Sequence, residues 1–248
     1  MNTDSRWLIR SQPQPDAIYR LLCLPYAGGN ASLFHSWPAQ LPELDMLAVQ
    51  PPGRASRLME PNCRDMSEYV EGLLLALEPW LDRNWAIFGH SMGALAGYAL
   101  LQRLQRSGLP LPDYFFISAS KGPQVENRIK KISYLDDECF IEELKKLNGT
   151  PTQVLENQEL INFCLPFIRA DFHLIENYLL GEFKPLPVTP ILLCGTEDDI
   201  TPQDMLLWNK LFKKSATVSM FPGNHFFLHE EDNLKNIFQL IKRHLPEN

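Results

Sequence analysis

The sequence predicts an α/β domain built on a mostly parallel β-sheet that helices cover on both faces. Short apolar runs alternate with longer segments of helical periodicity along the chain. The short runs are predominantly apolar without strict alternation, which is typical of strands buried on both faces of a parallel sheet. The chain has 248 residues, of which 45% are hydrophobic, enough to bury a sizeable core. We therefore expect one domain over residues 1–248.

The first two strand-like runs are stopped by residues that break a strand. Residues 19–24 lead into Pro25, and residues 46–50 lead into Pro51-Pro52-Gly53. Proline cannot donate a ladder hydrogen bond, and glycine favours turns. Four further apolar runs are predicted as strands: residues 85–89, 114–118, 190–194 and 216–221.

Three segments outside these strands have the pattern of helices. From Met66 to Trp80, apolar residues recur every three or four positions, so a helix is predicted there with Asp65 or Ser67 as its N-cap. An Ala- and Leu-rich segment after Ser91 and residues 233–244 are predicted as two more helices.

Residues 124–185 interrupt the alternation of strands and helices. They contain no strand-like run, but residues 136–147 and 158–178 have helical periodicity. An insertion of this length is too long for an ordinary connection. We expect a helical lid over the carboxyl ends of the strands, where open α/β sheets bind ligands. The alternative is a pair of helices packed on the side of the domain.

The most informative motif is Gly89-His90-Ser91-Met92-Gly93, which follows a strand-like run and precedes a helix. G-x-S-x-G in this context predicts a nucleophile elbow, a tight turn that exposes the serine hydroxyl at the edge of a sheet. The helix behind it would direct its N-terminal N–H groups toward a developing oxyanion. The alternative is a glycine-rich turn with a capping serine.

A serine nucleophile needs a base, and the base needs an acid that orients it. In this arrangement the acid and then the histidine follow the serine along the chain. Asp198 is predicted as the acid because it lies just beyond the run 190–194, and Asp199 is the alternative. His225 is predicted as the base because it follows the last strand in a glycine-bearing loop, and His229 is the alternative.

Two further inferences concern the surroundings of the serine. His90 precedes it on the strand side and is interpreted as a packed residue that supports the turn. The backbone N–H groups of Met92 and Ala27 are predicted to form the oxyanion hole, with Tyr26 as the alternative to Ala27. Ala27 lies in a loop whose glycines, Gly28 and Gly29, permit close backbone approach.

Composition excludes several other classes of function. A net charge of −7 argues against nucleic acid as the main partner. The sequence contains no run of 18 apolar residues, so no membrane-spanning helix is expected, and the polar N-terminus does not have the pattern of a signal peptide. Five cysteines without a C-x-x-C motif suggest reduced thiols and a cytoplasmic location. The sequence has no dinucleotide-binding motif, P-loop or zinc-type cluster, so no nucleotide or metal cofactor is expected.

Taken together, the motifs resemble those of the stand-alone type II thioesterases of nonribosomal peptide and polyketide synthesis, a group that includes the medium-chain acyl thioesterase of fatty-acid synthesis. G-H-S-M-G and G-x-x-D are shared by many hydrolases, whereas the motifs P-x-A-G-G, P-G-R-x-x-R and I-R-A-D are more specific to this family. The matching segments are Leu24-Pro25-Tyr26-Ala27-Gly28-Gly29, Gln50-Pro51-Pro52-Gly53-Arg54 with Arg57, Gly89–Ala94, Pro166-Phe167-Ile168-Arg169-Ala170-Asp171, Gly195–Asp198 and Pro222–Phe226.

The resemblance implies an α/β-hydrolase fold with a helical lid and a Ser91–His225–Asp198 triad. It implies a substrate carried as a thioester on the phosphopantetheine arm of a peptidyl or acyl carrier protein, no cofactor in the enzyme itself, and a role in clearing stalled or misprimed acyl groups from a synthase. Acyl-CoA or medium-chain fatty acyl thioesters are the alternative substrates, and a binding protein without activity and an acyltransferase are the competing functions. We expect a monomer.

Two sets of basic residues deserve separate interpretation. Arg54 and Arg57 are interpreted as pinning their loop through bonds to backbone or carboxylates, although they could instead shape the mouth of the site. A carrier protein could dock on one of two basic clusters, which could also be ordinary solvated surface. These clusters are Arg128, Lys130 and Lys131, and Lys210, Lys213 and Lys214.

Overall fold

A seven-stranded β-sheet forms the centre of the computed structural model, which describes residues 6–125, 130–147 and 157–245. The strand order is β1-β3-β2-β4-β5-β6-β7. All neighbouring strands are parallel except β1, which runs antiparallel to β3. The strands are β1 (Leu8–Ile9), β2 (Tyr19–Leu24), β3 (Leu44–Val49), β4 (Asn84–His90), β5 (Tyr114–Ser118), β6 (Thr189–Gly195) and β7 (Val218–Phe221).

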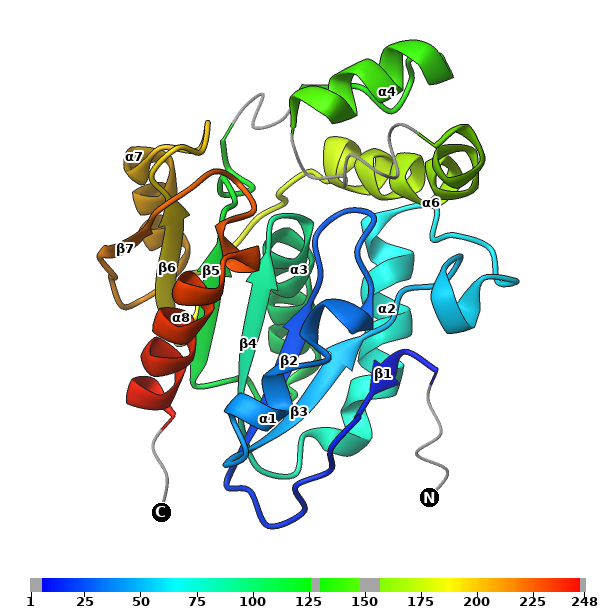
Figure 1. Cartoon of the computed structure of the whole chain (residues 1–248). Helices are drawn as coiled ribbons and strands as arrows, with labels where there is room; N and C mark the ends of the chain where they lie inside the picture. Colours follow the sequence, from blue (N-terminus) through cyan, green and yellow to red (C-terminus); the bar gives the residue numbers. More distant parts are fainter. Residues whose placement is uncertain (1–5, 126–129, 148–156, 246–248) are drawn as a thin grey trace.

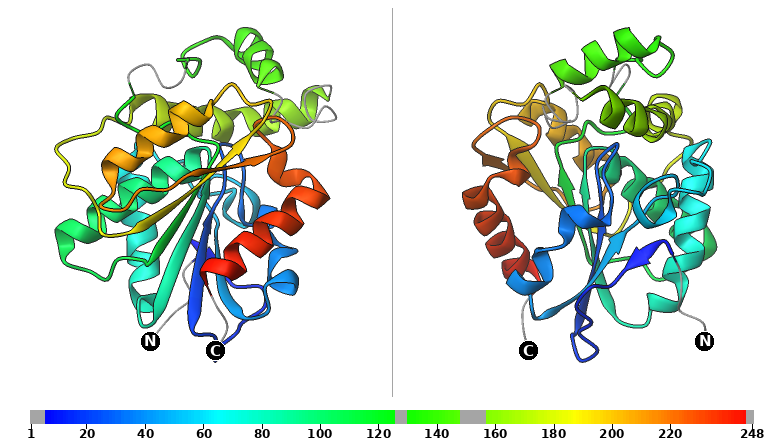
Figure 2. Two further views of the ribbon diagram at one scale, coloured as in Figure 1. Left: turned by 90° about the vertical axis from the view of Figure 1, so that its left-hand side faces the viewer. Right: turned by 45° about the vertical axis from the view of Figure 1, so that its right-hand side comes forward.

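Helices cover both faces of this sheet (Figures 1 and 2). The pair α2 and α3 lies on one face, and α1 and α8 lie on the other, as the left-hand view of Figure 2 shows. The helices are α1 (Trp37–Gln40), α2 (Met66–Leu77), α3 (Met92–Ser107), α4 (Asp137–Lys146), α6 (Gln158–Asn177), α7 (Pro202–Leu206) and α8 (Glu231–His244). No helix among the described residues is long and apolar enough to cross a membrane.

Alternate side chains of the central strands supply the two halves of the core. In β2 and β4, Leu22 and Ile87 pack toward α2 and α3, whereas Leu21 and Phe88 pack toward α1 and α8. All four side chains are fully buried, which explains why apolar residues occupy neighbouring positions in these strands rather than every second position. The predicted doubly covered, mostly parallel sheet is confirmed.

The element boundaries differ from the sequence prediction where the local signal is weak. β3 begins at Leu44 rather than at residue 46, and β7 begins at Val218 rather than at residue 216. Asp65, not Ser67, caps α2 by accepting a hydrogen bond from the Glu68 N–H at 2.8 Å. β1 and α1 were not predicted, because elements of two to four residues are too short to show a period.

The inserted helices α4 and α6 form a lid above the carboxyl ends of the strands (Figures 1 and 2). Two side chains of α6 hold the segment that leads into α4. Arg169 donates to the Ser133 carbonyl at 2.7 Å, and the buried Glu176 carboxylate accepts the N–H groups of Ile132 and Ser133 at 2.7 and 3.0 Å. The lid is therefore a hydrogen-bonded unit.

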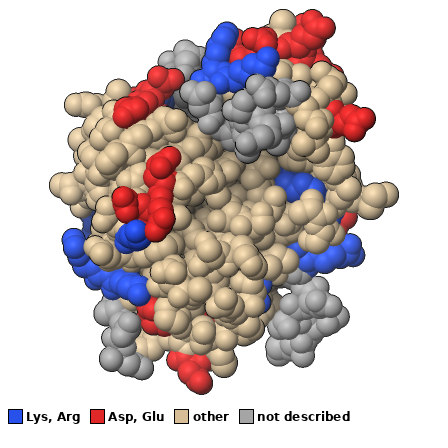
Figure 3. Space-filling view, in the orientation of Figure 1, with Lys and Arg blue, Asp and Glu red and all other residues tan. Residues whose placement is uncertain are grey.

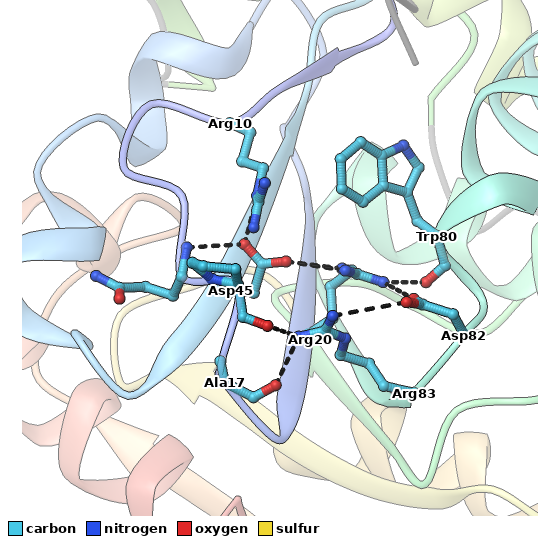
Figure 4. A network of polar contacts seen from close by, with 9 residues as sticks. Arg10, Ala17, Arg20, Asp45, Trp80, Asp82 and Arg83 are labelled. Carbon is cyan, nitrogen blue, oxygen red and sulfur yellow. Dashed lines mark hydrogen bonds and ion pairs between the residues drawn. The ribbon is translucent and has the colours of Figure 1, made fainter. Parts of the chain in front are cut away.

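A buried ionic network ties the N-terminal segment to the opposite end of the sheet (Figure 4). Asp45 on β3 is fully buried and accepts from Arg10 at 2.6 Å and from Arg20 on β2 at 2.9 and 3.0 Å. Arg20 also donates to the carboxylate of Asp82 and lies over the Trp80 ring. The Asp45 carboxylate thus pairs with both guanidinium groups in a low-dielectric setting, and Asp82 supplies a second negative charge to Arg20.

We predict that Asp45→Ala lowers the free energy of unfolding by about 3–5 kcal/mol, because it leaves the buried Arg20 without its main counter-charge. Asp82→Ala is the matched control, since Asp82 pairs with the same arginine but its side chain is 56% exposed. We expect that variant to lose about 0–1 kcal/mol. Denaturant titration of both variants checks this, and equal losses would contradict it.

Candidate functional site

Ser91 occupies a strained turn between β4 and α3. Its backbone has φ 55° and ψ −114°, a region that residues with a side chain rarely adopt. Its N–H donates to the Ser118 carbonyl at the end of β5, at 2.8 Å, so the neighbouring strand holds the turn in place. The hydroxyl consequently projects beyond the carboxyl ends of the strands.

Two glycines make this turn possible by close approach rather than by unusual dihedral angles. A Cβ atom on Gly93 would lie 2.3 Å from the Leu24 carbonyl oxygen, and one on Gly89 would lie 2.5 Å from the Gly93 carbonyl oxygen. Both contacts are with backbone atoms, which cannot move aside. The predicted strand–turn–helix geometry is therefore present, and any side chain at these positions would push α3 away from β2 and β4.

The structure brings Ser91, His225 and Asp198 into one hydrogen-bonded line. His225 Nε2 lies 2.9 Å from Ser91 Oγ, and His225 Nδ1 lies 2.9 Å from Asp198 Oδ2. The Asp198 side chain is 3% exposed, and its other oxygen accepts the Ile200 N–H at 3.1 Å. With Nδ1–H donating to Asp198, Nε2 is left to accept the proton of the Ser91 hydroxyl. Asp199, the alternative acid, is exposed to solvent.

The alternative base and the preceding histidine have other partners. His229 Nε2 lies 3.1 Å from the Tyr26 hydroxyl, and burial lowers the pKa of His229. His90 is fully buried, and its Nδ1 lies 2.8 Å from Ser118 Oγ. Burial lowers the pKa of His90 well below its ordinary value, and the neighbouring His225 and His229 add to this. His90 is thus a neutral packed residue whose ring centre lies 5.4 Å from that of His225.

The two residues whose N–H groups are predicted to form the oxyanion hole line the same cavity as Ser91. Ala27 and Met92 both line it, and Met92 is the first residue of α3. Neither backbone N–H has a hydrogen-bond acceptor among the described residues. Unpaired N–H groups at a helix N-terminus and in an adjacent loop are suited to a developing negative charge.

A cavity of about 530 Å³ extends from Ser91 beneath the lid. Figure 3 shows that this face of the molecule is hollowed below the lid and that uncharged side chains border much of the hollow. Its wall is formed largely by apolar side chains from both lid helices and from the segment before α4. These are Ile132, Leu144, Leu147, Ile168, Phe172 and Ile175.

Arg54, in the loop after β3, and Asp171, on the lid helix α6, form a buried ion pair. Arg54 Nη2 donates to Asp171 Oδ1 at 2.7 Å, Nη1 also bonds Asp171, and both side chains are almost fully buried. Burial lowers the pKa of Arg54, but the charge and hydrogen bonds of Asp171 outweigh this and raise it. Arg57 pairs with Glu60 at 2.6 Å and donates to the Gln50 carbonyl at 3.0 Å.

The interpretation that both arginines pin their loop is confirmed, but the sequence did not predict that the partner of Arg54 comes from the lid. Asp171 was part of a recognised motif without an assigned role. The available signal was its apolar setting on α6, because a carboxylate on a buried helix face requires a partner. No group of three potential metal ligands occurs in the described part of the chain.

The sheet, the elbow and the aligned Ser91, His225 and Asp198 define the class of protein as an α/β-hydrolase with a serine-type site. The family model of the thioesterase domain matches residues 19–245, and the chain belongs to that family.

Individual relatives agree with this assignment. Linear gramicidin dehydrogenase LgrE of Brevibacillus parabrevis is 38% identical over 232 residues, covering 92% of this chain and 88% of its own. Gramicidin S biosynthesis protein GrsT of Aneurinibacillus migulanus is 34% identical over 229 residues, covering 91% of this chain and 89% of its own. The structure of the type II thioesterase BorB from the borrelidin biosynthetic cluster superimposes with a TM-score of 0.87 at 33% identity. The match covers 96% of this chain and 97% of the BorB chain. These likenesses confirm the resemblance and the fold that the motifs predicted.

We predict that His90 makes the protein less stable in mild acid. As the pH falls below 6.5, the unfolded chain binds a proton at His90, whereas the folded protein, with its lowered pKa, does not. Stability is therefore lost as the pH falls, by up to about 1.4 kcal/mol per pH unit from this group. His90→Asn should weaken the pH dependence of the unfolding free energy between pH 7.5 and 5.5, measured by urea titration. An unchanged slope would mean that His90 takes up its proton equally in the folded and unfolded states.

Proposed function

We propose that this protein hydrolyses acyl thioesters carried on the phosphopantetheine arm of carrier proteins, and so removes stalled or misprimed acyl units from a nonribosomal peptide or polyketide synthase. The observation that supports this best is the Ser91–His225–Asp198 line, with both contacts at 2.9 Å, at the floor of a largely apolar cavity. The relatives named for gramicidin synthesis and the BorB structure favour the same context.

The first half of the reaction would acylate Ser91. His225 Nε2 accepts the hydroxyl proton as Oγ attacks the thioester carbonyl carbon, and Asp198 stabilises the imidazolium that forms. The N–H groups of Ala27 and Met92 bind the oxyanion of the tetrahedral intermediate. Because Ser91 is already held in a strained turn by its bond to Ser118, little reorganisation precedes the attack.

The second half would release the free acid. Collapse of the tetrahedral intermediate expels a thiolate, which leaves readily because a thiol has a pKa of about 8.5. Water then attacks the acyl-Ser91 ester, with His225 again acting as the base. Both halves use only side chains and backbone of this chain together with the thioester, so the enzyme itself would need no cofactor.

The carrier protein would be the partner of a monomeric enzyme, and it would present its arm at the open edge of the cavity. Carrier proteins of this kind are commonly acidic, as is this chain with its net charge of −7, so a local basic or apolar patch would have to receive them. Lys130 lies at the edge of the cavity and pairs with Glu143 at 2.8 Å. Lys131 is exposed beside it, whereas Arg128 lies outside the described residues. The second cluster, Lys210, Lys213 and Lys214, is also exposed.

We predict that Asp198→Asn lowers kcat by about 10⁴-fold, because the amide no longer holds His225 in the tautomer that accepts the Ser91 proton. Asp199→Asn is the matched control, since it makes the same change one residue away on an exposed side chain. We expect it to retain kcat within about threefold, because it has no contact with His225. Steady-state hydrolysis of an acyl-N-acetylcysteamine thioester by both variants checks this. Equal kcat in the two variants would exclude Asp198 as the acid.

We also predict that the protein clears acetyl-phosphopantetheinyl carrier protein much faster than acetyl-CoA, and that Ser91→Ala abolishes both reactions. The acyl group and thiol chemistry are the same in the two substrates, so the difference isolates recognition of the carrier. Intact-mass spectrometry follows the carrier, and analysis of the released acid separates hydrolysis from acyl transfer.

Each outcome of this comparison discriminates between functions. Equal rates on the carrier and on CoA would replace the carrier-directed function with a general acyl-thioester hydrolase. A wild-type protein as inert as Ser91→Ala on both substrates would overturn the proposed activity and favour a binding role.

A further inference from the structure

The buried Arg54–Asp171 pair reaches the backbone of the loop that carries Ala27. Asp171 Oδ2 accepts the Gly28 N–H at 2.7 Å, and Arg54 Nη1 donates to the Gly29 carbonyl at 3.2 Å. The two side chains are 2% and 3% exposed, so water does not compete for these bonds. The loop is thereby held by a carboxylate at the Ala27–Gly28 peptide and by a guanidinium at the Gly29–Asn30 peptide.

The first of these peptides, Ala27–Gly28, directly follows the Tyr26–Ala27 peptide, whose N–H group is assigned to the oxyanion. Gly28 adopts φ +80°, and the Gly29 N–H closes the turn onto the Tyr26 carbonyl at 2.9 Å. The orientation of the Ala27 peptide is therefore fixed from its C-terminal side by Asp171 and Arg54. A shift of the Gly28 N–H would rotate the adjoining Ala27 peptide relative to Ser91.

The carboxylate that anchors the loop belongs to the lid helix that lines the cavity. Ile168 and Phe172 on α6 line the cavity and flank Asp171 along the helix. A Cβ atom on Gly28 would lie 3.0 Å from Ile168 Cγ1, so helix and loop are also in van der Waals contact. Arg54 packs over Phe167 of the same helix, with its guanidinium carbon 5.0 Å from the ring centre.

We infer that Arg54 and Asp171 are positioning residues for the oxyanion hole, and that they make the lid helix α6 part of the catalytic centre rather than only a cover. The inference rests on the proposed thioesterase function. In this arrangement α6 contacts the acyl chain through Ile168 and Phe172 and orients the Ala27 N–H through Asp171. The competing explanation is that the pair merely stabilises the fold.

Three variants separate positioning from stability. Asp171→Asn keeps the shape of the side chain but removes the charge that Arg54 requires. The double variant Arg54→Met with Asp171→Leu replaces the pair by apolar side chains, an exchange that often restores stability. Glu176→Gln is the matched control, because Glu176 is a buried carboxylate on the same helix that also accepts backbone N–H groups, but those of Ile132 and Ser133.

The readouts are the thermal midpoint, kcat and KM on hexanoyl-N-acetylcysteamine, and the binding of two inhibitors. A hexyl trifluoromethyl ketone adds to Ser91 and places an oxyanion in the hole, whereas a hexyl thioether of N-acetylcysteamine reports ground-state binding only. We expect Asp171→Asn to lower kcat about 10- to 100-fold with KM changed less than about threefold. Ketone affinity should fall by a similar factor, and thioether affinity should not.

The double variant decides between the two explanations. We expect it to recover the wild-type thermal midpoint while kcat and ketone affinity stay low. We expect Glu176→Gln to retain the wild-type kcat and ketone affinity. Recovery of kcat together with the midpoint, or an equal loss of kcat in Glu176→Gln, would overturn the positioning role. If the wild-type protein hydrolysed no thioester and did not bind the ketone, the proposed function itself would fail.

Discussion

The close approach of the first turn of α3 to the end of β2 is the constraint on which the rest of the site depends. Gly93 lies so near the Leu24 and Pro25 carbonyl groups that even one methyl group would collide with them. This approach places the Met92 N–H, at the start of α3, beside the loop that continues from β2 to Ala27. Ala27, Met92 and Ser91 line one cavity because backbone packs directly on backbone at this point.

Two buried carboxylates, Asp45 and Asp171, offset the cost of burying their charge by pairing with arginine, but the two pairings have different consequences. Asp45 pairs with Arg10 and Arg20 at the end of the sheet remote from the site, where the bonds tie strands and the N-terminal segment together. Asp171 neutralises Arg54 but also accepts the Gly28 N–H from the loop that carries Ala27. An isolated buried charge is costly in both places. Of the two, only the Arg54–Asp171 pair also orients a peptide next to the reacting atoms.

The sequence was informative wherever a single local pattern determines the outcome. Continuous apolar runs identified the central strands, and G-x-S-x-G between a strand and a helix identified the turn at Ser91. The order of serine, aspartate and histidine led to the three residues that the structure aligns. The choice between Asp198 and Asp199 could not be made from local pattern, because both follow the same strand. It depends on which side chain points inward, and that is set by the turn from Gly195 to Ile200.

What the sequence could not supply were contacts between segments distant along the chain. Arg54 and Asp171 are separated by 117 positions, and Gly28 and Asp171 by 143. Each belongs to a motif that was recognised separately, and no periodicity links one to another. Their meeting follows from the placement of the lid over the carboxyl ends of the strands, where α6 descends onto the loop after β2. The three motifs most specific to this family are therefore three parts of one buried cluster, which gives a physical reason for finding them together in one chain.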